Sequence, residues 1–254
     1  MAEKLRIIAH RGVSSEAPEN TVAAFVKCLE YGIRWFEFDV QMAADSSVIV
    51  MHDDTVDRTT NGTGAVADMS FDQLRRLDAG AWFGAGYRLE RIPELATIIE
   101  LLNRYDLCAN LEIKPDFGTS EHRAQFTEAL AASVGQLKDH DRLLVSSFQP
   151  EMLARFRSVN DKIPRALLIE KQPLATDITG VVELAQELDC QAVNPEDKGL
   201  QPGQVQVLRE AGLQVNVWTV DDAARARELY EWGVAGVFTN RPRQLLEELG
   251  DIAS

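Results

Sequence analysis

Short apolar runs alternate with amphipathic stretches along almost the whole of this 254-residue chain. Runs rich in β-branched and aromatic residues predict strands, and apolar positions repeating every three or four residues predict helices. The pattern predicts eight strands, each followed in due course by a helix. The strands are expected at 5–9, 34–40, 107–114, 142–148, 165–169, 190–195, 213–220 and 234–239, and the helices at 19–32, 93–105, 120–137, 150–159, 177–188, 203–212, 222–233 and 242–250.

Eight strand–helix units in about 250 residues are typical of an α/β (β/α)8 TIM barrel. A doubly wound open sheet is the alternative, but no G-x-G-x-x-G follows the first strand. One connection is much longer than a usual loop, because about fifty residues separate the second strand from its helix. We interpret it as a back-strand at 47–51 followed by a small insertion subdomain at 53–92, with Trp82 and Phe83 in its core, inside a single domain spanning 1–254.

Acidic side chains collect on two of the predicted strands. Glu37 and Asp39 are two residues apart, so both point to the same face of their strand. Glu112 and Lys114 repeat this spacing on another strand. Converging carboxylates without a cysteine or histidine cluster favour one divalent cation bound through oxygen, Mg²⁺ or Ca²⁺. A purely structural ion pair between Glu112 and Lys114 is the alternative.

Two of the four histidines, His10 and His52, fall at the ends of predicted strands. In a (β/α)8 barrel these ends meet at the mouth that carries the active site. A cation together with Arg11 and Lys114 could bind a phosphoryl group, while one histidine removes a proton and the other donates one. This combination predicts cleavage of a phosphate ester.

Charge and cysteine content narrow the setting. The net charge of −14 disfavours nucleic acid and stable membrane association, because both partners require a basic surface. Neither a membrane span nor a signal peptide is expected. Cys28, Cys108 and Cys190 are widely spaced, so we expect buried free thiols and a cytoplasmic protein.

Six motifs occur in the order and at the spacing found in the glycerophosphodiester phosphodiesterases, and the chain resembles the soluble bacterial type of that family over nearly its full length. The motifs are AHRG…APENT (9–21), EFDV (37–40), MHDDTVDRTTNGTG (51–64), NLEIKP (110–115), SSF (146–148) and VWTV (217–220).

The resemblance implies a (β/α)8 barrel with an insertion after the second strand. It implies that a small-molecule glycerophosphodiester is split into sn-glycerol 3-phosphate and an alcohol. The residues expected to do this are His10 and His52 as acid and base, Glu37, Asp39 and Glu112 as metal ligands, Arg11 and Lys114 as phosphate contacts, and Phe148 and Trp218 as pocket walls.

Two other functions stay open at this point. One is a phospholipase C or D of related barrel type that acts on intact lipid, and the other is a barrel that binds a phosphodiester without cleaving it. Asn20 and Thr21 are expected to cap the helix at 19–32, and Arg58 could pair with nearby acids or with substrate. Residue types leave the head group, the oligomeric state and the identity of the acid and the base undecided.

Overall fold

The computed structural model describes residues 4–116 and 118–254. Its strands are β1 (Arg6–Ala9), β2 (Trp35–Met42), β3 (Val48–Val50), β4 (Cys108–Ile113), β5 (Leu143–Ser147), β6 (Arg165–Ile169), β7 (Ala192–Pro195), β8 (Gln214–Val217) and β9 (Gly236–Thr239). Eight of them are parallel and form a ring in the order β1-β9-β8-β7-β6-β5-β4-β2, which closes where β2 pairs with β1. The fold is therefore the expected TIM barrel, and the open doubly wound sheet is excluded.

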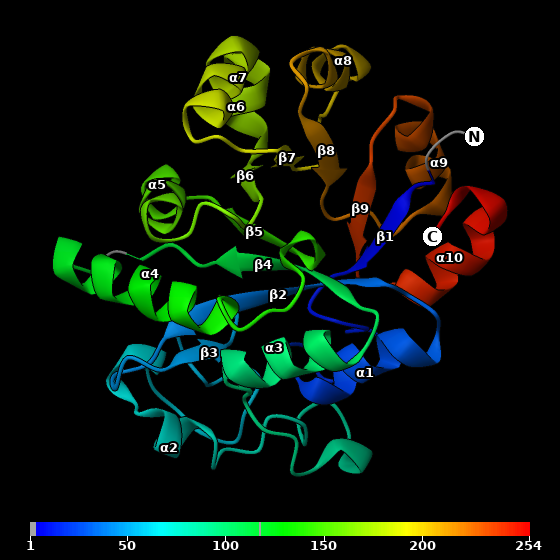
Figure 1. Ribbon diagram of the computed structural model, residues 1–254. Helices are drawn as coiled ribbons and strands as arrows, with labels where there is room; N and C mark the ends of the chain where they lie inside the picture. Colours follow the sequence, from blue (N-terminus) through cyan, green and yellow to red (C-terminus); the bar gives the residue numbers. More distant parts are fainter. Residues whose placement is uncertain (1–3, 117) are drawn as a thin grey trace.

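Helices surround the ring of strands (Figure 1). They are α1 (Val22–Glu30), α2 (Phe71–Leu74), α3 (Leu95–Arg104), α4 (Ser120–Val134), α5 (Pro150–Val159), α6 (Lys171–Thr176), α7 (Ile178–Glu187), α8 (Pro202–Glu210), α9 (Ala223–Glu231) and α10 (Pro242–Leu249). The predicted elements are present. Most are shorter than expected by a few residues, α5 and β6 match their expected bounds, and β2 ends two residues later than expected; the short helices α2 and α6 were not predicted. No helix in the described part of the chain is long and apolar enough to span a membrane.

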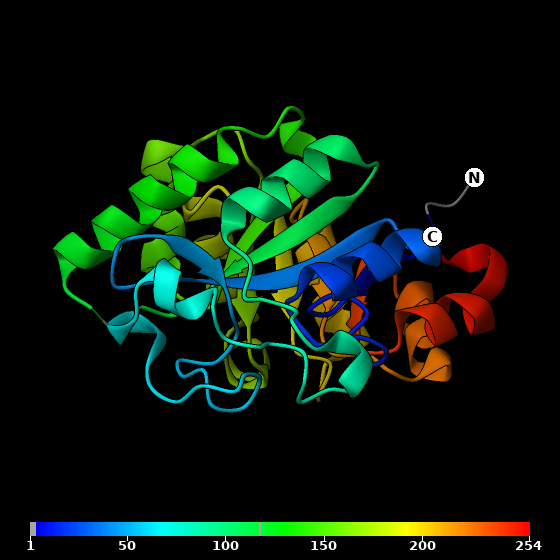
Figure 2. The same cartoon turned by 90° about the horizontal axis from the view of Figure 1, so that it is seen from below.

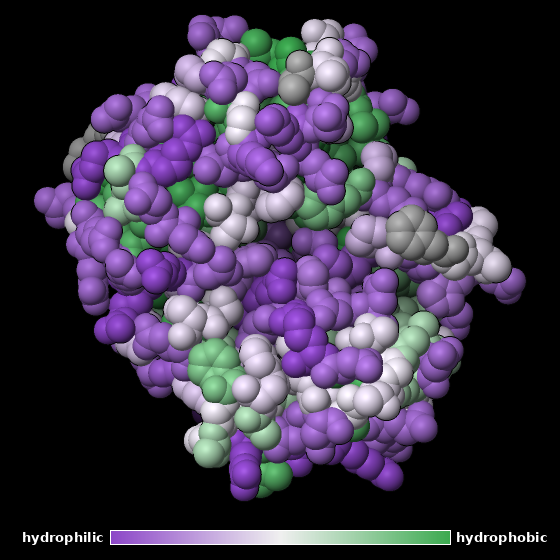
Figure 3. Space-filling view, turned by 180° about the vertical axis from the view of Figure 1, so that it is seen from behind, coloured by the Kyte–Doolittle hydropathy of each residue, from purple (hydrophilic) through white to green (hydrophobic). Residues whose placement is uncertain are grey.

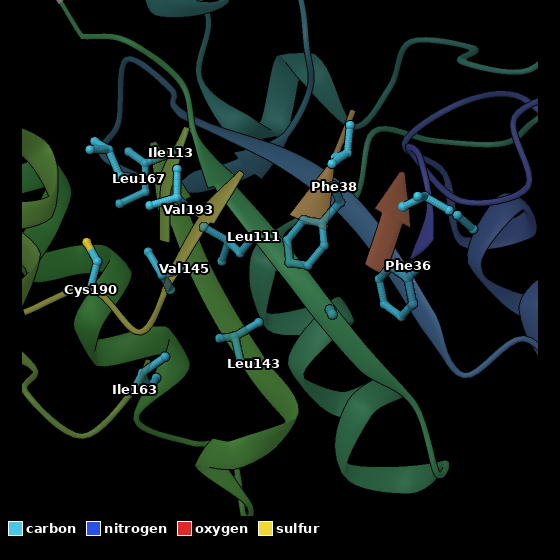
Figure 4. Packing of buried hydrophobic residues seen from close by; sticks show 14 of the residues in the cluster. Phe36, Phe38, Leu111, Ile113, Leu143, Val145, Ile163, Leu167, Cys190 and Val193 are labelled. Atoms are coloured by element: carbon cyan, nitrogen blue, oxygen red, sulfur yellow. The ribbon is translucent and has the colours of Figure 1, made fainter. Parts of the chain in front are cut away.

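Side chains alternate along β2 between two environments: the apolar layer between the strands and the helices, and the inside of the ring of strands. Phe36 and Phe38 point outward and pack with Phe25 of α1, with ring centroids 4.6 and 6.0 Å from that of Phe25. Leu111 and Ile113 of β4 join the same apolar layer between strands and helices (Figure 4). The alternate positions of both strands therefore face the inside of the ring.

The long connection after β2 begins with β3, which pairs antiparallel with β2 outside the ring. The remainder of the connection, including α2, lies beneath β2 and β3 in Figure 1, and Figure 2 shows it from below. A second apolar cluster lies under this segment and is separate from the main core; its buried members are Ala43, Ile49, Met51, Val56, Val66, Leu74, Ala79 and Ile92.

The expectation that Trp82 belongs to the core of the insertion is wrong. Its side chain is 41% exposed, because it lies at the edge of an aromatic group in which Phe83 contacts both Trp82 and Tyr87 edge-on. The indole N–H of Trp82 donates to the carbonyl of Ala79, which fixes the ring at the surface.

The two ends of the described chain lie side by side. The amide of Ser254 donates to the carbonyl of Leu5, and the amide of Ile7 donates to the carbonyl of Ser254. The carboxyl end lies beside α10 in Figure 1. Three free cysteines, Cys28, Cys108 and Cys190, are buried as expected.

Candidate active site

The turn that follows β1 places His10 and Arg11. Arg11 has φ 57°, a left-handed conformation that is uncommon for a residue with a side chain. Gly12 follows with φ 77°, and a Cβ there would lie 2.7 Å from Cβ of Ala24 in α1. Only glycine fits between this turn and the helix. The tight turn directs the backbone N–H of Arg11 at Oε2 of Glu37, 2.9 Å away.

Three carboxylates meet inside the ring. Asp39 of β2 lies opposite Glu112 of β4 in the parallel register, and Glu37 lies two residues earlier on β2. Each offers an oxygen within 4.8 Å of the others. All three residues are buried, with exposed fractions of 3% for Glu37, 1% for Asp39 and 9% for Glu112. In the described chain, Oε1 of Glu37 and Oδ1 of Asp39 are buried without a hydrogen-bond partner. Buried carboxylate oxygens without partners are costly, so this group is suited to bind a cation.

Mutual repulsion and burial act on the pKa values of these groups. Burial and the charges of Asp39 and Glu112 raise the pKa of Glu37 well above its usual value. Burial and Asp39 raise the pKa of Glu112 to about 7, against the opposing effect of Lys114. Burial would also raise the pKa of Asp39, but the charges of Lys114, Arg11 and His52 outweigh it and lower that pKa. A divalent cation would stabilise all three in the ionised form.

Two cationic side chains border the carboxylates. The Nζ of Lys114 lies 2.8 Å from Oε1 of Glu112 and 3.5 Å from Oδ1 of Asp39. The Nη1 of Arg11 lies 2.8 Å from Oε1 of Glu19, and its Nε lies 3.6 Å from Oδ2 of Asp39. The site therefore brings positive charge into a chain that is strongly acidic as a whole.

The two histidines reach the same place from different elements. His10 follows β1, and its Nε2 lies 3.9 Å from Oε2 of Glu37 while its Nδ1 contacts Oδ1 of Asn240 at 2.8 Å. Burial and the charge of Arg11 lower the pKa of His10. His52 follows β3, and its Nδ1 lies 2.6 Å from Oδ1 of Asp53.

A cavity of about 190 Å³ joins these groups at the carboxyl ends of the strands. All the predicted site residues except Asp39 line it; Phe148 and Trp218 face each other edge-on with centroids 5.4 Å apart. An apolar groove of about 720 Å³ between α5 and α7 shares Phe148 and Leu168 with the cavity. The groove is larger, but it lacks the carboxylates, histidines and basic residues that line the cavity. Figure 3 shows the face of the molecule opposite to that in Figure 1, which is mostly hydrophilic and hollowed near its middle.

Sequence reasoning anticipated that Arg58 could pair with nearby acids, but it missed the contact of Asn20 with Asp39 and did not say which acids Arg58 binds. Thr21 caps α1 as expected, but Asn20 does not: its Nδ2 donates to Oδ2 of Asp39 at 2.8 Å, and its Oδ1 accepts from the amide of Asp39. Arg58 bonds both Glu19 and Asp53, which joins the turn after β1 to the segment after β3. Their positions within the APENT and MHDDTVDRTTNGTG motifs were the available signal.

Fold and site together define the class of protein: a (β/α)8 barrel with a charged cavity at the carboxyl ends of its strands, which is where barrel enzymes carry their active sites.

Comparison with known proteins identifies the family. Residues 10–244 match the Glycerophosphoryl diester phosphodiesterase family. A glycerophosphodiester phosphodiesterase of Caldanaerobacter subterraneus is 32% identical over 96% of this chain and 97% of its own length, and one from Bacillus subtilis is 31% identical over 94% and 85%. The chain therefore belongs to this family and is a glycerophosphodiester phosphodiesterase, a hydrolase.

A solved structure agrees with both fold and family. A phosphodiesterase of Oleispira antarctica, determined in complex with the product sn-glycerol-3-phosphate, superposes with a TM-score of 0.89. It is 31% identical to this chain, and the match covers 97% of each.

Proposed function

We propose that the protein hydrolyses glycerophosphodiesters to sn-glycerol 3-phosphate and a free alcohol, with one divalent cation, Mg²⁺ or Ca²⁺, held by Glu37, Asp39 and Glu112. The observation that carries this proposal is the cluster of three buried carboxylates, two of whose oxygens lack a hydrogen-bond partner among the described residues, beside two imidazoles and two basic side chains. The product bound to the related Oleispira antarctica enzyme supports the glycerol phosphate half of the substrate.

The donor set fits a hard cation. All three ligands are carboxylates, and the described residues around them include no thiolate and no cluster of imidazoles. When bound, such an ion polarises a phosphoryl oxygen and neutralises charge that develops during cleavage.

The basic side chains have a separate task in this proposal. Arg11 and Lys114 line the cavity. Each also forms an ion pair with a carboxylate, Arg11 with Glu19 and Lys114 with Glu112. Burial opposes the charge on both, but Asp39 holds the pKa of each side chain above its usual value, with Glu19 adding to this at Arg11 and Glu112 at Lys114. Both therefore stay positively charged and can bind the non-bridging oxygens of the phosphodiester.

His10 and His52 are placed to move protons. One takes a proton from the attacking oxygen as the new P–O bond forms, and the other donates a proton to the alcohol oxygen as the old P–O bond breaks. Phe148 and Trp218 form the apolar wall of the cavity and orient the substrate. Hydrolysis consumes one water molecule and leaves the metal ligands unchanged.

The decisive experiment is a coupled glycerol 3-phosphate assay on a panel of glycerophosphodiesters, with Mg²⁺, Ca²⁺ or chelator. We expect release of glycerol 3-phosphate with at least one cation and none with excess chelator. Glu112→Gln keeps the size of the side chain but removes a ligand charge, so it should lower activity and weaken metal affinity. Glu183→Gln in α7, outside the cavity, serves as the matched control and should change neither.

Two results would contradict the proposal. Full activity in excess chelator would exclude the cation, and release of free phosphate or of a phosphorylated alcohol in place of glycerol 3-phosphate would exclude the bond assigned. Hydrolysis of intact phospholipid vesicles at a comparable rate would favour the phospholipase alternative. Binding of a glycerophosphodiester without any product would favour a barrel that binds and does not cleave.

A further inference from the structure

The imidazole of His10 is held by a pair of residues on the opposite end of the sequence. Its Nδ1 contacts Oδ1 of Asn240 at 2.8 Å, 230 residues away in the chain. Asn240 follows β9, the strand that pairs with β1, so the barrel closure brings the two together. Asp221, after β8, contacts Asn240 from the side away from His10.

The contacts of Asp221 fix which way the Asn240 amide faces. One carboxylate oxygen of Asp221 accepts from Nδ2 of Asn240 at 3.0 Å, and the other accepts from the backbone N–H of Asn240 at 2.7 Å and from the hydroxyl of Thr239 at 2.9 Å. An ionised carboxylate only accepts hydrogen bonds, so the amide must turn its NH₂ group toward Asp221. The carbonyl oxygen of Asn240 is left to face His10.

A carbonyl oxygen also only accepts, so Nδ1 of His10 must carry the proton in this contact. The neutral imidazole then has its free lone pair on Nε2. That nitrogen lies 3.9 Å from Oε2 of Glu37, on the side of the ring that faces the catalytic cavity. We propose that Asn240, oriented by Asp221, is a positioning residue that holds His10 as the Nδ1–H tautomer, with Nε2 free to accept a proton during phosphodiester cleavage.

The two catalytic imidazoles are thus supported in different ways. His52 contacts the carboxylate of Asp53 directly, and Arg58 holds the pKa of that carboxyl well below its usual range. On its Nδ1 side, His10 contacts the uncharged amide of Asn240, and the carboxylate of Asp221 lies one residue further away. A neutral partner fixes the tautomer without adding a negative charge next to the ring.

The tautomer can be measured without any activity assay. The chain has four histidines, so ¹⁵N-histidine labelling gives few imidazole signals, and His10→Gln assigns those of His10. At alkaline pH, in the substrate-free protein, we expect Nδ1 of His10 to be protonated and Nε2 unprotonated. In Asp221→Asn, two NH₂ groups would face each other, so the Asn240 amide turns over and His10 shifts toward the Nε2–H tautomer.

Kinetics then test whether this orientation matters for turnover, a step that rests on the proposed function. Asn240→Ala and Asp221→Asn should each lower kcat at least about tenfold while KM changes less than about twofold, since neither residue lines the cavity. Asp221 does not touch His10, so a loss of kcat in Asp221→Asn that accompanies the shift of tautomer is specific to the amide orientation.

Exchanging the pair provides a rescue. In Asn240→Asp combined with Asp221→Asn, the carboxylate at position 240 still accepts from Nδ1 of His10 and from the new amide at position 221. The amide oxygen at 221 can accept the bonds that Asp221 accepted. We expect this double variant to restore the Nδ1–H tautomer and most of kcat, whereas Asn240→Asp alone places two carboxylates together and stays impaired.

Asn103→Ala is the control for the loss of an asparagine that only connects two segments of the chain. The side chain of Asn103 donates to the carbonyl of Gln136 and accepts from the amide of Lys138. This variant should keep kcat and KM. An Nε2–H tautomer of His10 in the unaltered protein would overturn the proposal, as would unchanged kcat in Asn240→Ala. A protein without any phosphodiesterase activity that still shows the expected tautomers would contradict the proposed function and leave the positioning by Asn240 intact.

Discussion

Buried charge lies in two regions of this barrel, and the structure treats the two in opposite ways. At the amino end of β6, the guanidinium of Arg165 is 1% exposed and is surrounded by acceptors: the carbonyls of Ile163, Leu188 and Asp189 and a carboxylate oxygen of Asp189. Toward the carboxyl ends of the strands, the carboxylates of Glu37 and Asp39 are as deeply buried, yet each has an oxygen without a hydrogen-bond partner among the described residues.

The difference separates structure from function. Each guanidinium nitrogen of Arg165 has an acceptor within the chain itself, so this buried charge needs no further partner. The carboxylates at the mouth repel one another, and their unpaired oxygens would gain partners only when a ligand such as a cation binds. A buried charged group indicates a binding site when some of its polar atoms have no hydrogen-bond partner in the protein. Burial alone is not such an indication.

The largest effect is expected at the mouth. His10→Ala and His52→Ala should each lower kcat by about 10²- to 10⁴-fold, because each removes one of the two proposed proton-transfer groups. The melting temperature should change little, since neither side chain belongs to the apolar core. The coupled glycerol 3-phosphate assay and circular dichroism measure the two quantities. Full activity in either variant would remove that histidine from the mechanism.

The reverse outcome is expected at the amino end. Arg165→Met should lower the free energy of unfolding by about 4 kcal/mol, because the buried carbonyls of Ile163 and Leu188 lose a donor and the ion pair with Asp189 is removed. Activity per folded molecule should stay the same. Arg157→Met removes an exposed arginine that bonds the carbonyl of Glu187, and it should cost within about 0.5 kcal/mol. Urea unfolding checks both, and equal costs for the two variants would contradict the comparison.

A change of pH should act on the buried carboxylates at the mouth. The pKa of Glu112 is raised to about 7 in the folded protein, so the fold retains a proton that the unfolded chain releases above about pH 4.5. The metal-free protein should therefore lose stability as pH rises from about 4.5 to about 7, by about 3 kcal/mol.

Urea unfolding in chelator, at about pH 5 and about pH 8, measures this loss. Glu112→Gln should flatten the dependence, and so should a saturating divalent cation, which binds the ionised form. An equally steep loss of stability in Glu112→Gln would show that Glu112 is not its source.

The smallest effect is expected at the rim. Phe148→Ala removes one ring of the edge-to-face pair with Trp218, an interaction worth about 0.5–1.5 kcal/mol. KM should rise about 2- to 10-fold while kcat changes little, as measured by steady-state kinetics. A large drop in kcat with unchanged KM would place Phe148 among the reacting groups.

The sequence predicted those features that depend on local periodicity. Alternation along β2 placed Glu37 and Asp39 on the face opposite to Phe36 and Phe38, and repeated strand–helix units predicted the barrel. Both follow from spacing within a single element, and each was confirmed by the structure.

Contacts between distant segments could not be predicted from spacing. Asn20 contacts Asp39 from a backbone conformation with φ 57°, and the residue pattern does not predict that angle. Arg165 was only the first residue of a predicted strand, because most of its acceptors belong to Leu188 and Asp189, which follow α7. Asn240 reaches His10 only after the last strand has closed against the first.

Because β1 pairs with β9, the ring of strands does not depend on where along the sequence the chain is opened. Ser254 and Leu5 are already hydrogen-bonded, so a short linker could join the two ends without moving either strand. A circularly permuted protein opened at the exposed turn of residues 44–46, between β2 and β3, would keep every parallel strand pair intact. Such a permutant would place His52 near its new amino end and His10 toward its new carboxyl end, so that the two halves of the active site would exchange their order of synthesis.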